Sequence, residues 1–249
     1  MSPSQPLTLH VRALVLDMDD TINQTTPAMR VALRTAAVGL WPQVPEERLH
    51  AAVERYAFDG AGWFQRFSSG QIDFETMRRG RLADMAAQLD NQLSDQQYES
   101  FEESYRAVFI DSCRAFDDAL RLLDRARAAQ VPVAVLSNSA HHMTRRKIHR
   151  IGLDDRFTAV LCADQLGAGK PDPGAYLAAC RAIGHEPGEV GYVDDLFRDA
   201  HGGAQAGLKA VWLDRIGEDG TPDSEHQVRS GDQAVPMIGG LDQLDVRLP

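Results

Sequence analysis

Five short apolar segments, each ending beside polar residues, constrain the fold of this chain more than any other feature. They lie at residues 11–17, 131–139, 157–164, 189–195 and 208–214. A strand that is apolar along nearly its whole length is buried on both faces, as in a parallel sheet. Helical patterns occupy residues 115–130, 141–152, 173–184 and 198–207, before and between the last four segments. This alternation predicts an α/β fold with a doubly wound, mostly parallel, Rossmann-like sheet.

One long interval breaks the alternation. Between residues 22 and 114 the apolar positions recur at a spacing of three and four, which is typical of helices, and no buried strand is evident. We therefore expect an α/β core domain made of residues 1–21 and 115–249, with an inserted helical domain at 22–114. Residues 217–232 are polar and rich in glycine, which indicates an exposed loop. Residues 235–244 are predicted to form a last short strand and a helical turn.

Composition and charge limit the class of protein. The formal net charge of −10 disfavours nucleic acid and anionic membranes as partners. The three cysteines, Cys113, Cys162 and Cys180, are widely spaced and fit a reduced protein. The first residues lack the pattern of a secretory signal, and no apolar run approaches the length of a membrane span. These features predict a cytoplasmic location and leave the choice between monomer and homodimer open.

The predicted strand ends carry the polar residues that matter most. Because the carboxyl ends of parallel strands meet at one edge of the sheet, these residues are expected to converge. They are Asp17, Asp19, Asp20 and Thr21 after the first segment, Ser137 and Asn138 after the second, Lys170 after the third, and Asp194, Asp195 and Asp199 after the fourth. Clustered carboxylates repel one another unless a cation neutralises them, and oxygen ligands without Cys or His favour Mg²⁺.

A lysine and a hydroxyl beside these carboxylates suggest an anion docked against the metal. Such an arrangement is typical of phosphoryl transfer, in which a metal and a cation spread the charge of the transferred group. An aspartate is a competent nucleophile in this chemistry and forms an aspartyl-phosphate.

The motifs resemble those of the haloacid dehalogenase-like hydrolases. The sequence has DxDxT at 17–21, Ser137-Asn138, Lys170-Pro171, and an Asp pair at 194–195 followed four residues later by Asp199. The resemblance runs from about residue 11 to residue 214, with the motifs in the family's order. The helical insertion at 22–114 is similar to the cap that some relatives carry between their first and second motifs.

The resemblance implies catalytic roles for four residues. Asp17 is identified as the nucleophile, and Asp19 as the general acid and base that serves the leaving oxygen and then water. Ser137 is expected to bind a phosphoryl oxygen, with Asn138 beside it as a further substrate-binding residue. Lys170 is expected to offset the charge of the phosphoryl group and of Asp17.

The same resemblance implies a Mg²⁺ site. Asp17 and Asp195 are expected as ligands, together with the main-chain carbonyl of Asp19. Asp199 is expected to orient the loop or the water molecules on the metal. Asp194 stands where many relatives have glycine, so its role is open between support of the metal site and a purely structural one.

Asp19 also distinguishes branches of the family. Relatives that cleave carbon–halogen bonds need no acid for the leaving group and resemble DxYxT at this point. A carboxylic acid suits cleavage of a phosphate ester, so we expect a Mg²⁺-dependent phosphatase that acts on a small phosphorylated metabolite through an aspartyl-phosphate. A phosphosugar mutase and a non-catalytic binding protein on the same scaffold are the alternatives.

Some charged and aromatic residues are expected to be structural. Arg145, Arg146, Lys147 and Arg150 form a basic run that is typical of a solvated helix face. In the helical insertion, Trp63 and Phe64 are expected in the core, and Arg78, Arg79 and Arg81 on the surface, with substrate selection by one or two of them as the alternative.

Overall fold

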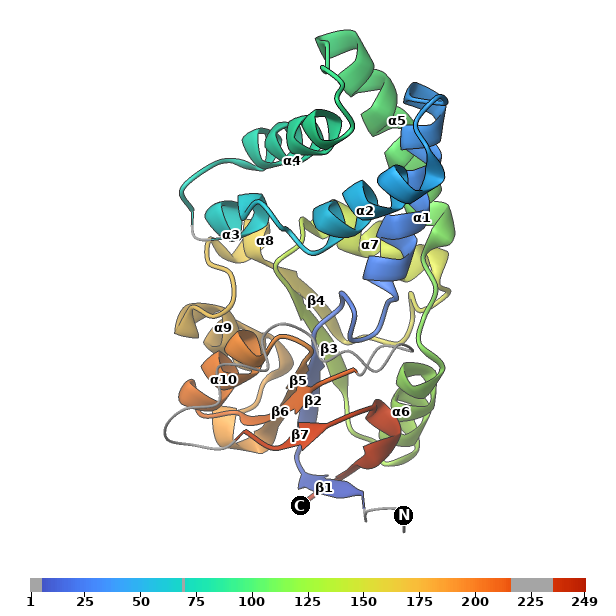
Figure 1. Cartoon of the computed structure of the whole chain (residues 1–249). Helices are drawn as coiled ribbons and strands as arrows, with labels where there is room; N and C mark the ends of the chain where they lie inside the picture. Colours follow the sequence, from blue (N-terminus) through green and yellow to red (C-terminus); the bar gives the residue numbers. More distant parts are fainter. Residues whose placement is uncertain (1–5, 69, 216–234) are drawn as a thin grey trace. The chain divides into compact units, whose positions relative to one another are not determined.

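The computed structural model describes residues 6–68, 70–215 and 235–249. The chain divides into two compact units (Figure 1). A core unit comprises Met1–Gln24 and Ala115–Pro249, and a helical unit comprises Thr25–Arg114. The loop predicted at 217–232 lies outside the described residues.

The core unit contains a six-stranded sheet in the order β4-β3-β2-β5-β6-β7, and each pair of neighbours is parallel. Its strands are β2 (Ala13–Leu16), β3 (Val133–Ser137), β4 (Ala159–Cys162), β5 (Val190–Asp194), β6 (Lys209–Leu213) and β7 (Met237–Ile238). The predicted parallel α/β class is thereby confirmed. The central strands β2, β3 and β5 are buried along their whole length, as their apolar sequences require.

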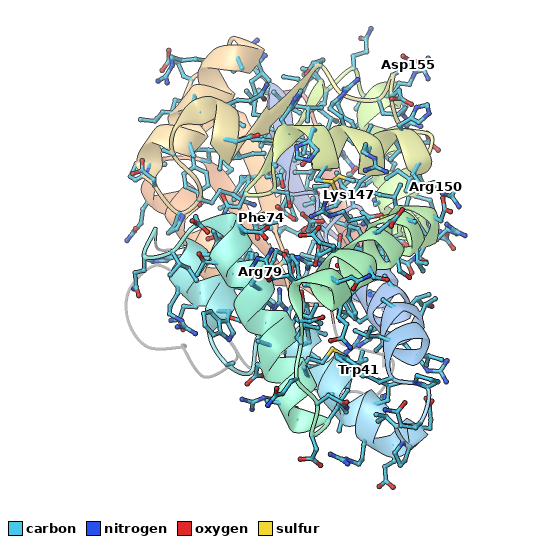
Figure 2. The ribbon with its side chains drawn as sticks, turned by 90° about the horizontal axis from the view of Figure 1, so that it is seen from above. Trp41, Phe74, Arg79, Lys147, Arg150 and Asp155 are labelled. Atoms are coloured by element: carbon cyan, nitrogen blue, oxygen red, sulfur yellow. The ribbon has the colours of Figure 1, made fainter. Side chains whose placement is uncertain are left out.

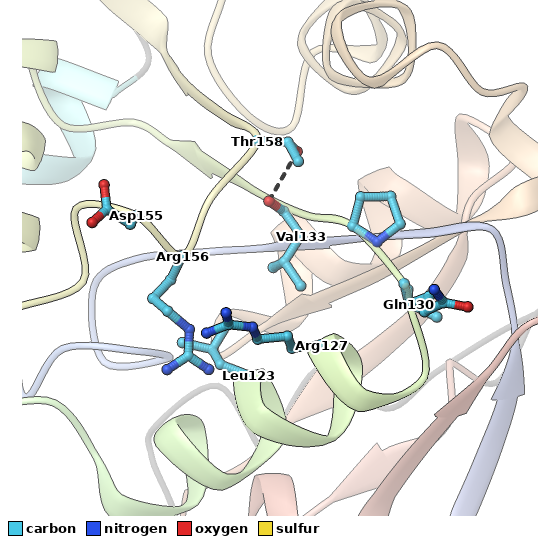
Figure 3. A pocket seen from close by; sticks show the side chains of 9 residues that line it. Leu123, Arg127, Gln130, Val133, Asp155, Arg156 and Thr158 are labelled. Carbon is cyan, nitrogen blue, oxygen red and sulfur yellow. Dashed lines mark hydrogen bonds between the residues drawn. The ribbon is translucent and has the colours of Figure 1, made fainter.

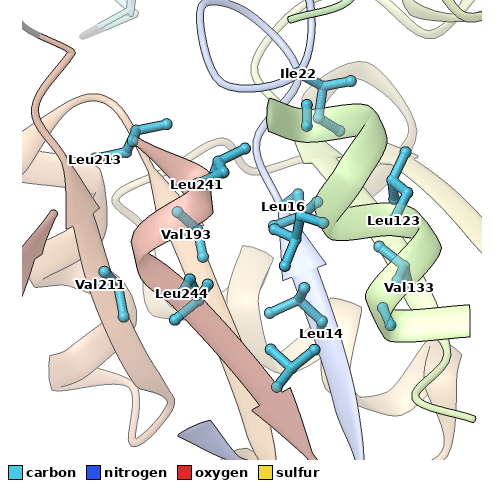
Figure 4. Packing of buried hydrophobic residues seen from close by; sticks show 14 of the residues in the cluster. Leu14, Leu16, Ile22, Leu123, Val133, Val193, Val211, Leu213, Leu241 and Leu244 are labelled. Atoms are coloured by element: carbon cyan, nitrogen blue, oxygen red, sulfur yellow. The ribbon is translucent and has the colours of Figure 1, made fainter. Parts of the chain in front are cut away.

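Helices cover both faces of this sheet. They are α6 (Asp117–Ala128), α7 (His141–Arg150), α8 (Ala163–Leu166), α9 (Pro173–Ile183) and α10 (Phe197–Gln205). Leu14 and Leu16 point into one apolar cluster, which includes Leu123 of α6 (Figure 4). Ala13 and Val15 point into the opposite cluster, which includes Tyr176 of α9. The period of two along β2 therefore supplies both faces of the sheet.

Two features of the core unit were not predicted from the sequence. A separate parallel pair joins β1 (Leu7–His10) to β8 (Leu244–Arg247), near the two ends of the chain. A short 3₁₀ turn forms at η1 (Pro187–Glu189). The segment 235–244 contains β7 and the helical turn η3 (Leu241–Gln243), as its sequence predicts.

The helical unit contains α1 (Thr25–Leu40), α2 (Glu46–Ala57), α3 (Trp63–Ser68), α4 (Phe74–Gln88) and α5 (Asp95–Ser112). Ser94 caps α5 by accepting a hydrogen bond from the main-chain N–H of Gln97, whose side chain accepts one in return. The side chain of Asp73 caps α4 in the same position. Helix α3 is a further element that the sequence did not predict.

Three expectations for side chains of the helical unit are wrong. Arg78 and Arg81 are buried rather than on the surface, whereas Phe64 is 38% exposed. The guanidinium of Arg78 donates to Glu102 and to the hydroxyl of Tyr56, at 2.6 Å. Arginines are buried where a carboxylate and aromatic faces can receive them, and a helical pattern alone does not show that. No helix in the described parts of the chain is long and apolar enough to cross a membrane.

Candidate active site

The carboxyl ends of three adjacent strands bring the predicted residues together. Asp17 follows β2, Ser137 ends β3 and Asp194 ends β5. Leu16 of β2 is in register with Val135 of β3 and Val193 of β5. The side chains that follow therefore emerge at one level of the sheet edge, where ligands of doubly wound sheets bind.

Lys170 is the cation at the centre of this edge. Its buried ammonium group lies 2.5 Å from Oδ1 of Asp17 and 2.7 Å from Oδ2 of Asp194. Tyr192 donates its hydroxyl to the same oxygen of Asp194, and the N–H of Leu196 donates to Oδ1 at 2.9 Å. We call Asp17, Lys170, Tyr192 and Asp194 the Lys170 cluster. Both oxygens of the Asp194 carboxylate therefore accept hydrogen bonds, and two carboxylates hold Lys170 in position.

Asn138 holds the main chain around Lys170. Its side-chain amide donates to the carbonyl of Lys170 at 3.0 Å, and its Oδ1 accepts from the N–H of Lys170 at 2.7 Å. A side chain at position 169 would place Cβ 2.8 Å from that Oδ1, so any residue larger than glycine would displace the Asn138 amide. The structure thus places Asn138 as a support for Lys170, and its contact with substrate stays a prediction.

The carboxylate of Asp19 is held by two donors. Ser139 donates its hydroxyl to Oδ2 at 2.8 Å, and Lys147 contacts Oδ1 at 2.5 Å. Lys147, labelled with Arg150 in Figure 2, is buried within α7, so the expectation that it belongs to a solvated face is wrong. Arg145, Arg146 and Arg150 are exposed. Thr144, Lys147 and Ile148 lie on one face of α7, at the spacing of three and four that marks a buried stripe.

Asp195 and Asp199 extend the acidic edge on the side of β5. The hydroxyl of Thr21 lies 3.5 Å from Oδ1 of Asp195, and the indole of Trp212 donates to the carbonyl of Asp195 at 2.9 Å. Asp199 is buried in the first turn of α10 and accepts from Arg198 at 3.0 Å. Asp195 thus follows β5 and Asp199 lies near the start of α10, and their roles at a metal site stay predictions.

Arg215 supports the loop that leaves the site. Its guanidinium donates to the carbonyls of Asp20 and Thr21, at 3.0 and 2.8 Å, and forms a bidentate pair with Asp118. Asp20 has a positive φ of 56°, an uncommon conformation for a non-glycine residue. Arg215 thereby fixes the backbone just after Asp19, a function that the sequence pattern did not reveal.

Burial and mutual repulsion shift the ionisation of the carboxyl groups. Burial raises the pKa of Asp17 to about 8; Lys170 opposes this shift, whereas the charges of Asp194 and Asp19 add to it. Burial, together with Asp194 and Asp17, raises the pKa of Asp195 well above its usual value. Although burial alone would lower it, the pKa of Lys170 is raised by Asp17 and Asp194. The site therefore has more negative charge than its lysine can offset.

The arrangement fits a hard cation. Oδ2 of Asp17 is buried and accepts no hydrogen bond from the described residues, a costly state for a carboxylate oxygen. Among those residues no three His, Cys, Asp or Glu side chains are arranged to hold a metal ion. The predicted set needs only two carboxylates, those of Asp17 and Asp195, because its third member is the carbonyl of Asp19. Oxygen donors of this kind suit Mg²⁺.

A cavity of about 530 Å³ lies elsewhere in the core unit (Figure 3). It is lined by residues of α6, of the α6–β3 connection and of the start of β3, including Arg127 and Val133, and by Asp155, Arg156 and Thr158. Val133 begins β3, whereas Ser137 ends it. The cavity is therefore at the amino end of the strand and contains none of the predicted site residues.

Comparison with known proteins places the chain among hydrolases with the motifs described above. Residues 11–207 match the sequence model of the haloacid dehalogenase-like hydrolases. The chain is 28% identical to phosphoserine phosphatase of Thermus thermophilus, over 89% of this chain and 96% of that protein. It is 33% identical to (S)-2-haloacid dehalogenase 4A of Burkholderia cepacia, over 50% of this chain and 55% of that one. The structure of the HAD-hydrolase YfnB of Bacillus subtilis, bound to magnesium, has a TM-score of 0.74 at 18% identity, covering 94% of this chain and 97% of that one.

Proposed function

The chain belongs to the haloacid dehalogenase-like hydrolases and is a phosphoric monoester hydrolase, and we propose that it cleaves a small phosphorylated metabolite with Mg²⁺ through an aspartyl-phosphate on Asp17. The observation that carries this proposal is the pair of carboxylates at the end of β2. Asp17 is buried against Lys170, whereas Asp19, two residues later, is partly exposed beside Ser139. One carboxylate is thus suited to attack and the other to proton transfer.

Asp19 separates this proposal from dehalogenation. Cleavage of an ester releases an alkoxide, which needs a proton, whereas cleavage of a carbon–halogen bond releases a stable halide, which does not. A positioned carboxylic acid two residues after the nucleophile therefore favours phosphate esters. The match to the phosphatase spans most of both proteins, whereas the match to the dehalogenase covers half of this chain.

In the first step, a carboxylate oxygen of Asp17 attacks phosphorus and the bond from phosphorus to the ester oxygen breaks. Asp19, in its protonated form, gives its proton to that oxygen, so the alcohol leaves neutral. Lys170 donates a hydrogen bond to Oδ1 of Asp17 and offsets negative charge on the transferred group. Ser137, buried at the end of β3, is expected to donate its hydroxyl to a phosphoryl oxygen.

In the second step, Asp19 takes a proton from water as the water oxygen attacks phosphorus. The bond between phosphorus and Asp17 breaks, which releases inorganic phosphate and restores the carboxylate of Asp17. The proton from water remains on Asp19, so the enzyme returns to its starting state. One water molecule is consumed and one alcohol and one phosphate are formed.

Asp17, Asp195 and the carbonyl of Asp19 would hold Mg²⁺, with Asp199 supporting the surrounding loop. The bound ion would supply positive charge to the phosphoryl oxygens. If these residues bind it, Mg²⁺ at 100 times its Kd should raise the free energy of unfolding by about 2.7 kcal/mol. Thermal denaturation of Asp195→Asn should show little of this gain, whereas Asp154→Asn, an exposed control at the far end of α7, should keep it.

We propose that the helical unit is a cap that helps to choose the substrate. Support comes from where its two linkers leave the core unit: the side chain of Gln24 donates to the carbonyl of Ala115 at 3.2 Å, and the N–H of Phe116 donates to the carbonyl of Ile22 at 2.9 Å. Both linkers therefore start from the edge that carries Asp17. The identity of the metabolite, the oligomeric state and the cytoplasmic location stay predictions.

The proposal is tested by phosphate release from a panel of phosphorylated metabolites and from p-nitrophenyl phosphate, with and without Mg²⁺. We expect metal-dependent release that Asp17→Asn abolishes. Interconversion of phosphosugars without net release would indicate a mutase instead. Chloride release from 2-chloropropionate would indicate a dehalogenase, and no turnover of any probe would indicate a binding protein.

A further inference from the structure

Lys147 is a buried lysine that the proposed reaction does not yet use. Its side chain is 4% exposed, and its ammonium group lies 2.5 Å from Oδ1 of Asp19. Burial of a lysine is unfavourable unless an opposite charge receives it. The sequence contains only three lysines, and the other two are Lys170 in the Lys170 cluster and Lys209, whose ammonium donates to the carbonyl of His10.

Lys147 and Ser139 together fix the orientation of the Asp19 carboxylate. They hold its two oxygens from separate parts of the fold, since Lys147 belongs to α7 and Ser139 to the loop that follows β3. With both oxygens held, rotation of the carboxylate is restricted. The side chain of Asp19 is still 27% exposed, so a substrate can reach it.

Charge makes the contact from Lys147 the stronger of the two. A hydrogen bond between an ammonium group and a carboxylate is roughly twice as strong as one between neutral groups. Lys147 also lies on the buried face of α7 with Thr144 and Ile148, so its stem is held by the packing of the helix. The ammonium group is therefore presented to Asp19 from a rigid element.

We propose that Lys147 is a positioning residue that aims the carboxylate of Asp19 for proton transfer to the leaving oxygen. The inference rests on the proposed function, in which Asp19 is the general acid. Loss of alignment of a catalytic group by about 1 Å costs on the order of 10²-fold in rate. Lys147 acts through Asp19 and need not touch the substrate.

The dependence on leaving group distinguishes positioning from a role in folding alone. Benzyl phosphate releases a strongly basic alkoxide and needs the acid, whereas p-nitrophenyl phosphate releases a stable phenolate and does not. The ratio kcat/KM includes only the steps up to ester cleavage, so it reports the acid and not the later attack by water. A variant that loses folded protein or general packing loses activity on both esters equally.

The experiment compares Lys147→Met with Lys209→Met, which makes the same chemical change at an exposed position. In Lys147→Met, kcat/KM for benzyl phosphate should fall on the order of 10²-fold, with little change for p-nitrophenyl phosphate. Lys209→Met should match the parent on both. In an Asp19→Asn background, Lys147→Met should add no further loss for benzyl phosphate, because the group that it aims is gone.

Equal losses on the two esters, or an additive loss in the Asp19→Asn background, would overturn the proposal. If Lys147→Met does not fold, Ser139→Ala removes another donor to Asp19 at a partly exposed site, and it should show the same preference for p-nitrophenyl phosphate. Equal losses from Ser139→Ala would also count against positioning. Absence of hydrolysis by the parent would refute the proposed function itself, which is a separate result.

Discussion

The two units of this protein each bury a charged cluster, and the clusters differ in balance. In the helical unit, Arg78 donates to Glu102 and Tyr56, and Arg106 donates to the second oxygen of Glu102 at 3.1 Å. We call these four residues the Arg78 cluster. In the core unit, Lys170 forms ion pairs with both Asp17 and Asp194. Its charge also acts on Asp195 and Asp199, where it opposes the rise in pKa that burial causes.

The difference separates a charge-balanced structural cluster from a cluster with a surplus of negative charge. In the Arg78 cluster each carboxylate oxygen has a cationic partner. In the Lys170 cluster, Oδ2 of Asp17 has no hydrogen-bond partner among the described residues, and the pKa of Asp17 is raised to about 8, chiefly by burial. A protein tolerates such a surplus where a bound cation or substrate compensates for it.

Removal of Lys170, the cation of the Lys170 cluster, should have the largest effect on the free energy of unfolding. Lys170→Met leaves Asp17 and Asp194 buried without a counter-charge, so the free energy of unfolding in urea should fall by about 3–5 kcal/mol. Lys209→Met, at an exposed position, should cause little change. Equal stability of the two variants would show that the Lys170 cluster does not depend on its cation.

A carboxylate-to-amide change in the Arg78 cluster should cost less, but should still destabilise. Glu102→Gln keeps an acceptor for Arg78 but removes the charge that balances it, so we expect a loss of about 1.5–3 kcal/mol in urea unfolding. The matched change Glu99→Gln, one turn earlier on the exposed side of α5, should be nearly neutral. A stable Glu102→Gln variant would mean that the pairing contributes nothing.

The same chemical change in the Lys170 cluster should have the smallest effect on stability. Asp17→Asn keeps an oxygen that accepts from Lys170 and removes a charge that burial already disfavours. Metal-free Asp17→Asn should therefore unfold at a urea concentration no lower than the metal-free parent. A clearly lower midpoint would show that Asp17 stabilises the fold, contrary to the contrast between the clusters.

Much of the core unit could be predicted because its signals are local. The apolar runs around β2, β3 and β5 specify buried strands, and a parallel sheet places Asp17, Ser137 and Asp194 at one edge. The pair β1–β8 was missed because it joins short, partly exposed segments near opposite ends of the chain. No local pattern reports such a pairing.

The partners of charged side chains were harder to predict. Lys147 lies within a run of basic residues that is otherwise exposed, and only its spacing of three from Thr144, on the buried stripe that also includes Ile148, shows that it faces inward. Arg78 is buried because Glu102 and Tyr56, on two other helices, receive it. Likewise Asn138 was expected beside the substrate, and its two bonds to the main chain of Lys170 depend on a loop far along the sequence.

The central claim is that Asp17 carries the phosphoryl group between two steps, and it can be observed directly. In Asp19→Asn, p-nitrophenyl phosphate should still react because its phenolate needs no proton, whereas attack by water should be slow without the base. We predict a burst of one p-nitrophenolate per chain, with one phosphoryl group on the peptide that contains Asp17, detected by mass spectrometry after acid quenching. Steady hydrolysis with no burst and an unmodified Asp17 would contradict this account.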